Sequence, residues 1–284
     1  NTLDYGKTED WILTRLPSYQ AIGKKAYNPG LNNVVKFISA LELSLDSLKL
    51  IHVGGTNGKG STSAYISSIL QESKYKVGIF TSPHFFDFRE RIKINNKMIE
   101  KSFIVNFIND NKNLIEKLEL SFFELSFCIS LAYFIKSKVD YSIIEVGLGG
   151  RLDATNIIDP LISIITNISY DHTDILGDTL EKIANEKAGI FKKNSKIIIG
   201  ERNKIVDEVF IKKAKEVSSS ITFVPDLNDQ ENYSNVNYLN TNIKTAVHTC
   251  RALNLNNVDN DSILSGISNI NKNSQLIGRW TTVS

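Results

Sequence analysis

The feature that most constrains the fold is the stretch Leu50 to Thr62, which ends an apolar run in glycines, a lysine and hydroxyls. Residues 50–53 are typical of a short buried strand, and residues 63–70 carry apolar side chains at helical spacing. Between them, residues 54–62 read Gly-Gly-Thr-Asn-Gly-Lys-Gly-Ser-Thr. A glycine-rich turn between a strand and a helix N-terminus points backbone N–H groups inward and attracts anions. The stretch therefore predicts a loop that binds the phosphates of ATP or a related nucleotide.

The spacing of this loop differs from the common Gly-x4-Gly-Lys-Ser/Thr pattern. Val53 stands where the first glycine is expected, and Gly60 separates Lys59 from the hydroxyls of Ser61 and Thr62. We expect Lys59 to be exposed in the loop and to reach the outer phosphates, and a following hydroxyl to hold Mg²⁺. The alternative, a plain glycine-rich connection, is disfavoured because the lysine and two hydroxyls accompany the glycines.

Composition excludes some classes of protein. The chain has 284 residues, 42% of them apolar, and a net charge of +2, so it can form a large core but shows no basic stripe for nucleic acid. Cys128 and Cys250 lie in apolar helical patterns and are expected to be buried free thiols. No signal peptide is recognised at the N-terminus, and the apolar segment Leu125–Ile135 is too short to span a bilayer. We expect a cytoplasmic protein that binds no membrane.

Strands and helices are predicted to alternate along the chain. The strands are 50–53, 76–81, 141–146, 161–166, 196–200 and 221–224; the helices are 33–43, 63–70, 101–118, 122–136, 178–188, 204–217, 240–253 and 262–270, with a turn at 95–96. Several strands are continuously apolar, which is typical of strands buried on both faces. The pattern predicts an α/β fold with a mostly parallel, doubly wound sheet.

Ligands of such sheets bind beyond the carboxyl ends of the strands. This rule groups the phosphate loop with Ser82, Glu145 and the loop after Thr166. Glu145 interrupts an apolar strand, so it is either a structural carboxylate bonded to a neighbouring loop or a Mg²⁺ ligand. His172 is either a solvated loop residue or a ligand beside Glu145. Lys187 either caps a helix C-terminus or acts at the metal site.

Eight segments also closely resemble the folylpolyglutamate synthase/dihydrofolate synthase family of the Mur ligase superfamily. They are Gly55–Ser61, Thr81–His84, Arg89–Ile92, Phe122–Glu124, Glu145–Asn156, Asp171–His172, Glu186–Ile190 and Gly278–Arg279. The segments follow the family order over nearly the whole chain, and Glu145–Asn156 is the most specific of them.

The resemblance implies roles for individual residues. ATP would be bound by Asn57, Gly58, Lys59, Gly60, Ser61, Thr62, Asn242 and Arg279, and Mg²⁺ by Ser61, Ser82, Glu145 and His172. The pterin-binding residues would be Phe122, Phe123, Glu124, Leu152, Asp153 and Ala154. Lys59, His172 and Lys187 would serve catalysis, Lys187 as a carbamate.

The implied reaction is ATP-dependent amide ligation through an acyl phosphate. The partners would be ATP, dihydropteroate or a reduced folate, and L-glutamate, and we expect a monomer. The resemblance implies that residues 1–277 are the ATP-binding domain and that 278–284 begin a linker to a further glutamate-ligase domain. It leaves open whether the enzyme is a dihydrofolate synthase, a folylpolyglutamate synthase or both.

Two other functions remain as alternatives. A Mur-type ligase of cell-wall peptides would share the ATP chemistry, but Gly60 and the Phe122–Glu124 segment resemble the folate branch. A nucleotide-binding fragment without turnover is the other alternative.

Overall fold

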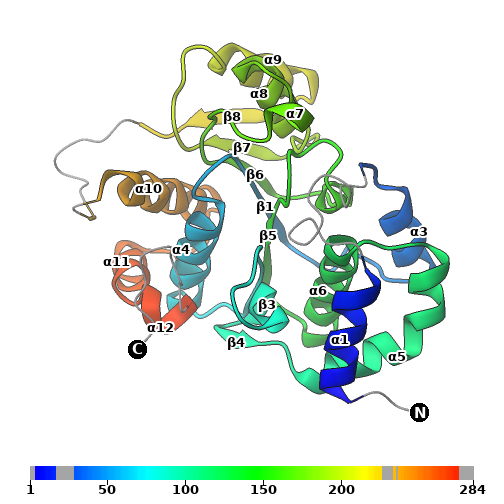
Figure 1. The fold of residues 1–284 in the computed structure, drawn as a ribbon. Coiled ribbons are helices and arrows are strands. Elements are labelled where there is room, and N and C mark those ends of the chain that lie inside the picture. The colour runs from blue at the N-terminus through cyan, green and yellow to red at the C-terminus, as the bar shows by residue number, and fades with distance from the viewer. Residues whose placement is uncertain (1–3, 17–28, 226–232, 235, 275–284) are drawn as a thin grey trace.

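The described residues form an eight-stranded sheet in a computed structural model that covers residues 4–16, 29–225, 233–234 and 236–274. The strand order is β4-β3-β2-β5-β1-β6-β7-β8 (Figure 1). The strands are β1 Leu50–Gly54, β2 Val77–Phe80, β3 Ile92–Ile94, β4 Lys97–Met98, β5 Tyr141–Glu145, β6 Ile162–Ile165, β7 Lys196–Ile199 and β8 Ser220–Phe223. Six of them are parallel, and β3 and β4 add an antiparallel edge. The predicted α/β class and mostly parallel sheet are confirmed.

Helices cover both faces of the sheet (Figure 1). One face packs against α4 Lys59–Glu72 and α10 Asn237–Ala252, and α11 Asn260–Ser268 and α12 Ile270–Ser274 pack on α4. The other is covered by α1 Tyr5–Arg15, α3 Asn32–Ala40, α5 Lys101–Lys117 and α6 Phe122–Ser137, and, further along the sheet, by α7 Thr173–Leu176, α8 Leu180–Ala188 and α9 Asp207–Glu216. Two short 3-10 helices, η2 Phe88–Arg91 and η3 Ala154–Ile157, complete the described elements.

The register of the central strands sets where the site lies. All residues of β1 and β5 are buried, as their continuous apolar character predicts. Val53 of β1 pairs with Glu145 of β5, and Gly54 pairs with Ile165 of β6. Because the three strands are parallel, the loops that follow them leave the sheet side by side.

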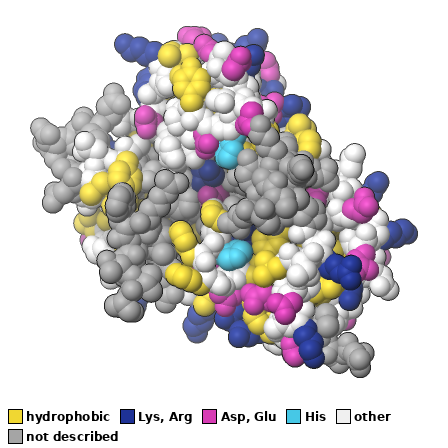
Figure 2. All heavy atoms as spheres, in the orientation of Figure 1, with side chains coloured by type: hydrophobic (Ala, Val, Ile, Leu, Met, Phe, Trp, Pro, Cys, Tyr) yellow, Lys and Arg dark blue, Asp and Glu magenta, His cyan; other side chains and the backbone are white. Residues whose placement is uncertain are grey.

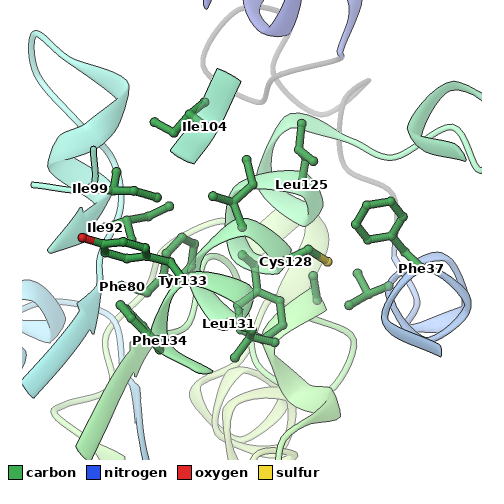
Figure 3. Packing of buried hydrophobic residues seen from close by; sticks show 14 of the residues in the cluster. Phe37, Phe80, Ile92, Ile99, Ile104, Leu125, Cys128, Leu131, Tyr133 and Phe134 are labelled. Atoms are coloured by element: carbon green, nitrogen blue, oxygen red, sulfur yellow. The ribbon is translucent and has the colours of Figure 1, made fainter. Parts of the chain in front are cut away.

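Helix α6 is the apolar centre of one layer (Figure 3). Phe127, Cys128 and Phe134 are fully buried between the sheet and the outer helices, so the helix is apolar on nearly every side. A Cβ on Gly78 of β2 would lie 2.7 Å from the Phe134 ring, so glycine allows the helix to sit close to the sheet. Cys128 and Cys250 are both buried free thiols, as expected.

Two parts of the fold differ from expectation. The edge strands β3 and β4 were not predicted, although Asn95 and Asn96, which form the turn between them, were. Helix α4 begins at Lys59 rather than near residue 63, so Lys59 lies partly buried in the first helical turn and not exposed in a loop. Within the described ranges, no helix has the length and apolarity needed to cross a membrane.

Helices α4 and α11 approach each other through Gly266. A Cβ at this position would lie 2.5 Å from the Cα of Ile69, and Ser68 Oγ donates to the Gly266 carbonyl at 2.6 Å. The contact is backbone to backbone, so it cannot relax by a change of rotamer.

We predict that Gly266→Ala lowers the free energy of unfolding by about 1–3 kcal/mol through overpacking, although alanine raises helix propensity by up to about 1 kcal/mol in an open helix. Ser268→Ala, on the exposed side of the same helix, is the control and should be neutral or stabilising. Urea unfolding monitored by circular dichroism gives both values. A Gly266→Ala protein as stable as the control would show that the helices are not in this close contact.

Candidate active site

The loop between β1 and α4 requires glycine at two positions. Gly55 has a φ of +133°, and a Cβ there would lie 1.9 Å from Thr166 Oγ1. Gly58, the residue before α4, has a φ of +79°, and its Cβ would lie 2.2 Å from Asn242 Oδ1. A side chain at either position would strain the backbone and would also collide with a neighbouring residue.

The loop after β6 holds this turn in place. Asn57 N–H donates to Asn167 Oδ1 at 2.9 Å, and Thr166 Oγ1 donates to the Asn57 carbonyl at 2.6 Å. Thr56 Oγ1 accepts from Ser169 N–H at 3.1 Å. No side chain caps the start of α4, so the N–H groups of its first turn remain available to an anion.

Two lysines converge on one carbonyl of the turn. Lys59 Nζ donates to the Gly55 carbonyl at 3.2 Å, and Lys187 Nζ, from the end of α8, donates to the same oxygen at 2.9 Å. Burial and, to a smaller extent, the charge of Lys59 lower the pKa of Lys187 to about 7, against the opposing effects of Asp171 and Asp153. Lys187 therefore combines a buried position with an amine that is readily neutral.

Glu145 ends β5 with its side chain 4% exposed, and its Oε2 accepts from Ser82 N–H at 3.1 Å. Burial raises its pKa to about 7, against the effects of Lys59, the Ser82 N–H and Arg91. A Cβ on Gly60 would lie 3.6 Å from Glu145 Oε2, so the first turn of α4 faces the carboxylate.

Ser61, Ser82 and Glu145 meet in a cleft of about 320 Å³. Its further lining comes from α4, the end of β2, the β3–β4 hairpin and α12: Gly58, Gly60, Ala64, Ser67, Ile79, Thr81, Pro83, Phe85, Glu90, Lys93, Asn96, Asn273 and Ser274. Figure 2 shows acidic and basic side-chain atoms together at the middle of this face of the molecule. The predicted grouping of strand ends is present.

The loop after β2 is fixed by a single carboxylate. The two oxygens of Glu90 accept from the N–H groups of Phe85, Phe86 and Asp87 at 2.8–2.9 Å. The side chains of Phe85 and Phe86 are 54% and 75% exposed, and Phe85 lines the cleft.

Other predicted nucleotide and metal residues are placed differently. His172 precedes α7 with a φ of +47°, contacts Asp171 Oδ1 at 3.6 Å through Nε2, and does not line the cleft that holds Ser61, Ser82 and Glu145. Asn242 is buried on α10 beside Gly58, where its Oδ1 accepts from Thr62 Oγ1 at 3.5 Å. Arg279 and the linker at 278–284 lie outside the described residues.

Of the three residues expected to bind substrate at the start of α6, only Phe123 is partly exposed. It covers Gly147, where a Cβ would lie 2.5 Å from its ring. Phe122 is 3% exposed within the core, and Glu124 caps its own helix by accepting from Ser121 N–H at 2.7 Å. Glu124 Oε1 is buried with no hydrogen-bond partner among the described residues, and burial raises the pKa of this carboxyl.

Asp153 closes the loop between β5 and η3. Its Oδ2 accepts from Leu148 N–H at 2.8 Å, and its Oδ1 accepts from the N–H of Thr155 at 3.0 Å. Leu152 is partly exposed and Ala154 begins η3. Asp153 therefore fixes the backbone of the loop. Of Leu152, Asp153 and Ala154, only Leu152 has a side chain accessible to a ligand.

Sequence reasoning gave no role to Arg91, which is 4% exposed. Its Nε donates to His84 Nδ1 at 2.8 Å, and its guanidinium lies 4.9 Å from the centre of the Phe122 ring. Burial lowers the pKa of Arg91 to about 10, while Glu145 and Glu90 oppose the shift. The sequence signal for Arg91 and His84 is that they lie in two of the segments that resemble the family, Arg89–Ile92 and Thr81–His84.

The sequence is similar to known proteins. Residues 53–271 match the model of the Mur ligase middle domain. The dihydrofolate synthase/folylpolyglutamate synthase of Bacillus subtilis is 40% identical over 201 residues, covering 68% of this chain and 45% of that protein. That of Haemophilus influenzae is 43% identical over 180 residues, covering 63% and 41%. The chain thus spans a little under half the length of these curated relatives.

Solved structures with the same fold were also found. The folylpolyglutamate synthase of Thermotoga maritima superposes with a TM-score of 0.82 at 30% identity, over 98% of this chain and 67% of that one. FolC of E. coli in complex with DHPP and ADP gives a TM-score of 0.83 at 29% identity, over 99% and 69%. A bifunctional folylpolyglutamate synthase/dihydrofolate synthase with Mn, AMPPNP and L-glutamate bound gives 0.82 at 27% identity, over 100% and 70%.

The burial of Lys187 predicts a pH-dependent stability. Its pKa falls from 10.5 in the unfolded chain to about 7 on folding, so the unfolded state binds more protons between these values. Stability from this group is therefore lowest below pH 7 and rises as the pH approaches 10. We predict that Lys187→Met raises the free energy of unfolding at pH 7 by about 1–3 kcal/mol, and that the gain shrinks toward pH 10.

Lys182→Met is the matched control, because Lys182 lies on the same helix with its side chain 63% exposed. It should change stability by less than about 0.5 kcal/mol and show no such pH trend. Urea unfolding at several pH values measures both. A gain for Lys187→Met that is independent of pH would mean that the pKa of Lys187 does not change on folding.

Proposed function

The chain belongs to the family of the Mur ligase middle domain, and from this premise we propose that its protein is an ATP-dependent ligase acting on folates. The proposed reaction adds L-glutamate to dihydropteroate, to reduced folates, or to both. The names of the relatives support the substrate class. Of the three solved structures, two are named for folylpolyglutamate synthase activity, and the third holds DHPP and ADP.

The observation that carries the proposal is the meeting of the phosphate loop, two lysines and a buried acid. Lys59 and Lys187 share the Gly55 carbonyl, and Glu145 is fixed by Ser82 N–H across the first turn of α4. Phosphoryl transfer needs positioned charge more than covalent help from the protein. The loop offers available N–H groups, Lys59 offers a positive charge, and Glu145 offers a carboxylate that can bind a cation.

The proposed chemistry has two steps. A carboxylate oxygen of the pteroate or folate attacks the γ-phosphorus of ATP, which forms an acyl phosphate and releases ADP. The amine of glutamate then attacks the acyl carbon and displaces phosphate, leaving an amide. Lys59 and the N–H groups of α4 would stabilise charge on the transferred phosphoryl oxygens. Asn242, beside Gly58, and Arg279 would contact the nucleotide.

The donor set at the cleft fits Mg²⁺. The hydroxyls of Ser61 and Ser82 and the carboxylate of Glu145 are hard oxygen donors, and His172 is a further proposed ligand from the next loop. The described residues contain no group of three or more His, Cys, Asp or Glu side chains able to hold a metal. This favours a cation bound by few protein oxygens together with nucleotide phosphates, where it would neutralise phosphate charge.

We also propose that Lys187 becomes a carbamate. Its pKa of about 7 leaves much of the amine unprotonated near neutral pH. An unprotonated Nζ can attack CO₂ and lose one proton, which converts the neutral amine beside the Gly55 carbonyl into an anionic carbamate. Phe123 and Leu152, the partly exposed members of the predicted substrate residues, would contact the pterin.

The direct test uses the full-length protein with ATP, Mg²⁺, dihydropteroate and glutamate, and follows products by mass spectrometry. We expect a product heavier by one glutamyl residue and one ADP per amide formed. ADP release without any glutamylated product would reject the ligase.

We predict that Lys59→Ala lowers the ligation rate by about 10²–10³-fold while the fold remains intact. The substitution removes the positive charge that stabilises the transferred phosphoryl group. Because the side chain is only partly buried, its loss leaves no core cavity. Lys193→Ala, at an exposed position, is the control and should retain wild-type rates. Wild-type turnover by Lys59→Ala would remove Lys59 from the mechanism.

We predict that Glu145→Gln shifts the Mg²⁺ titration of the ligation rate to higher concentration and lowers the maximal rate. The amide keeps the shape and can still accept from Ser82 N–H, but it lacks the charge that attracts a cation. The measurement is initial rate against Mg²⁺ at saturating ATP. Coincident titration curves would show that Glu145 has only a structural role.

A further inference from the structure

His84 lies between the proposed metal residues and the proposed substrate surface, with one ring nitrogen directed away from its anchor. We propose that His84 Nε2–H donates a hydrogen bond to the carboxyl group of the pteroate or folate that is to be activated. This rests on the proposed function and adds a residue that determines which end of the substrate is accepted.

The tautomer of His84 follows from its contact with Arg91. Arg91 Nε donates to His84 Nδ1 at 2.8 Å, and a guanidinium can only donate. Nδ1 must therefore accept, and in a neutral ring Nε2 then carries the hydrogen. The outer edge of the ring is a donor.

The described residues supply a hydrogen-bond partner for Nδ1 but none for Nε2. The ring is partly exposed, and it is held between Phe122 and Phe88, with ring centres 6.1 and 6.5 Å away. A donor with a fixed direction and no acceptor in the described protein is suited to an external acceptor.

The position of His84 identifies that acceptor. It follows Ser82 by two residues, and Ser82 N–H binds Glu145 at the proposed metal end of the cleft. On its other side it packs on Phe122, whose neighbour Phe123 covers Gly147 at the proposed pterin surface. His84 lies beside the cleft rather than in its lining, so a substrate with its pterin at Phe123 and its carboxyl group near Glu145 would pass His84 close to the carboxyl end.

The charge behind the ring favours an anionic acceptor. The buried guanidinium of Arg91 polarises the imidazole through Nδ1, which makes Nε2–H a stronger donor. A hydrogen bond to a carboxylate is among the stronger ones that proteins form. The chemistry therefore points to the carboxylate of the substrate and not to an apolar part of its ring.

Two substitutions separate this role from support of the fold. His84→Asn places an amide oxygen near the position of Nδ1, so Arg91 keeps an acceptor while the outer donor is lost. His84→Gln carries its amide N–H about as far as Nε2. We expect the asparagine variant to bind dihydropteroate about 10- to 100-fold more weakly, the range for a lost bond to a charged group, and the glutamine variant to recover most of the affinity.

The experiment measures binding to the full-length protein by calorimetry for dihydropteroate and for a reduced pterin that lacks the benzoate carboxyl group. If His84 contacts the carboxylate, His84→Asn weakens dihydropteroate only, while binding of the second pterin, the KM for ATP and the melting temperature stay unchanged. Equal weakening of both ligands, or no weakening of either, overturns the inference. If the wild-type protein binds neither ligand, the proposed function fails and this inference fails with it.

Discussion

The candidate site depends on the burial of opposite charges at the carboxyl end of an apolar sheet. Glu145 and Lys187 are both 4% exposed, and burial moves the pKa of each to about 7 from opposite directions. The charge of Lys59 acts on both groups. It favours the ionised form of the Glu145 carboxyl and disfavours the protonated form of Lys187. An anion placed on the loop would oppose the charge of Lys59, so the protonation of both buried groups is coupled to what the loop binds.

The strand order of the sheet brings these charged groups together. Strand β1 is central, with β5 on one side and β6 on the other, so the phosphate loop is flanked by the loop after Glu145 and the loop after Thr166. The second of these fixes the turn through Thr166 and Asn167, and α8, which follows it in the chain, brings Lys187 to the Gly55 carbonyl. Each partner comes from a separate segment, and parallel register brings them together.

The sequence predicts the features that are local or periodic. Most of the parallel strands are mainly apolar runs of four or five residues, and the phosphate loop and Glu145 stand out against them. Strands β3 and β4 have three and two residues, too short for a period to be recognised. The burial of Phe122 and the capping role of Glu124 depend on how α6 packs, which local pattern does not contain. The pairing of Arg91 with His84, seven residues apart, depends on how the chain turns after β2, and the shifted pKa of Lys187 arises only when distant segments meet.

The clamp formed by Glu90 has a consequence for association. By accepting from three successive N–H groups, this carboxylate fixes the backbone of residues 85–87 as the chain folds. Ordering a free residue costs about 1–2 kcal/mol in backbone entropy. A loop that is already ordered adds no such cost when a ligand arrives, so the exposed ring of Phe85 meets it on a preorganised backbone. The affinity for a ligand at this loop then depends on the desolvation of the ring and on its contacts with the ligand, because little backbone entropy is lost on binding.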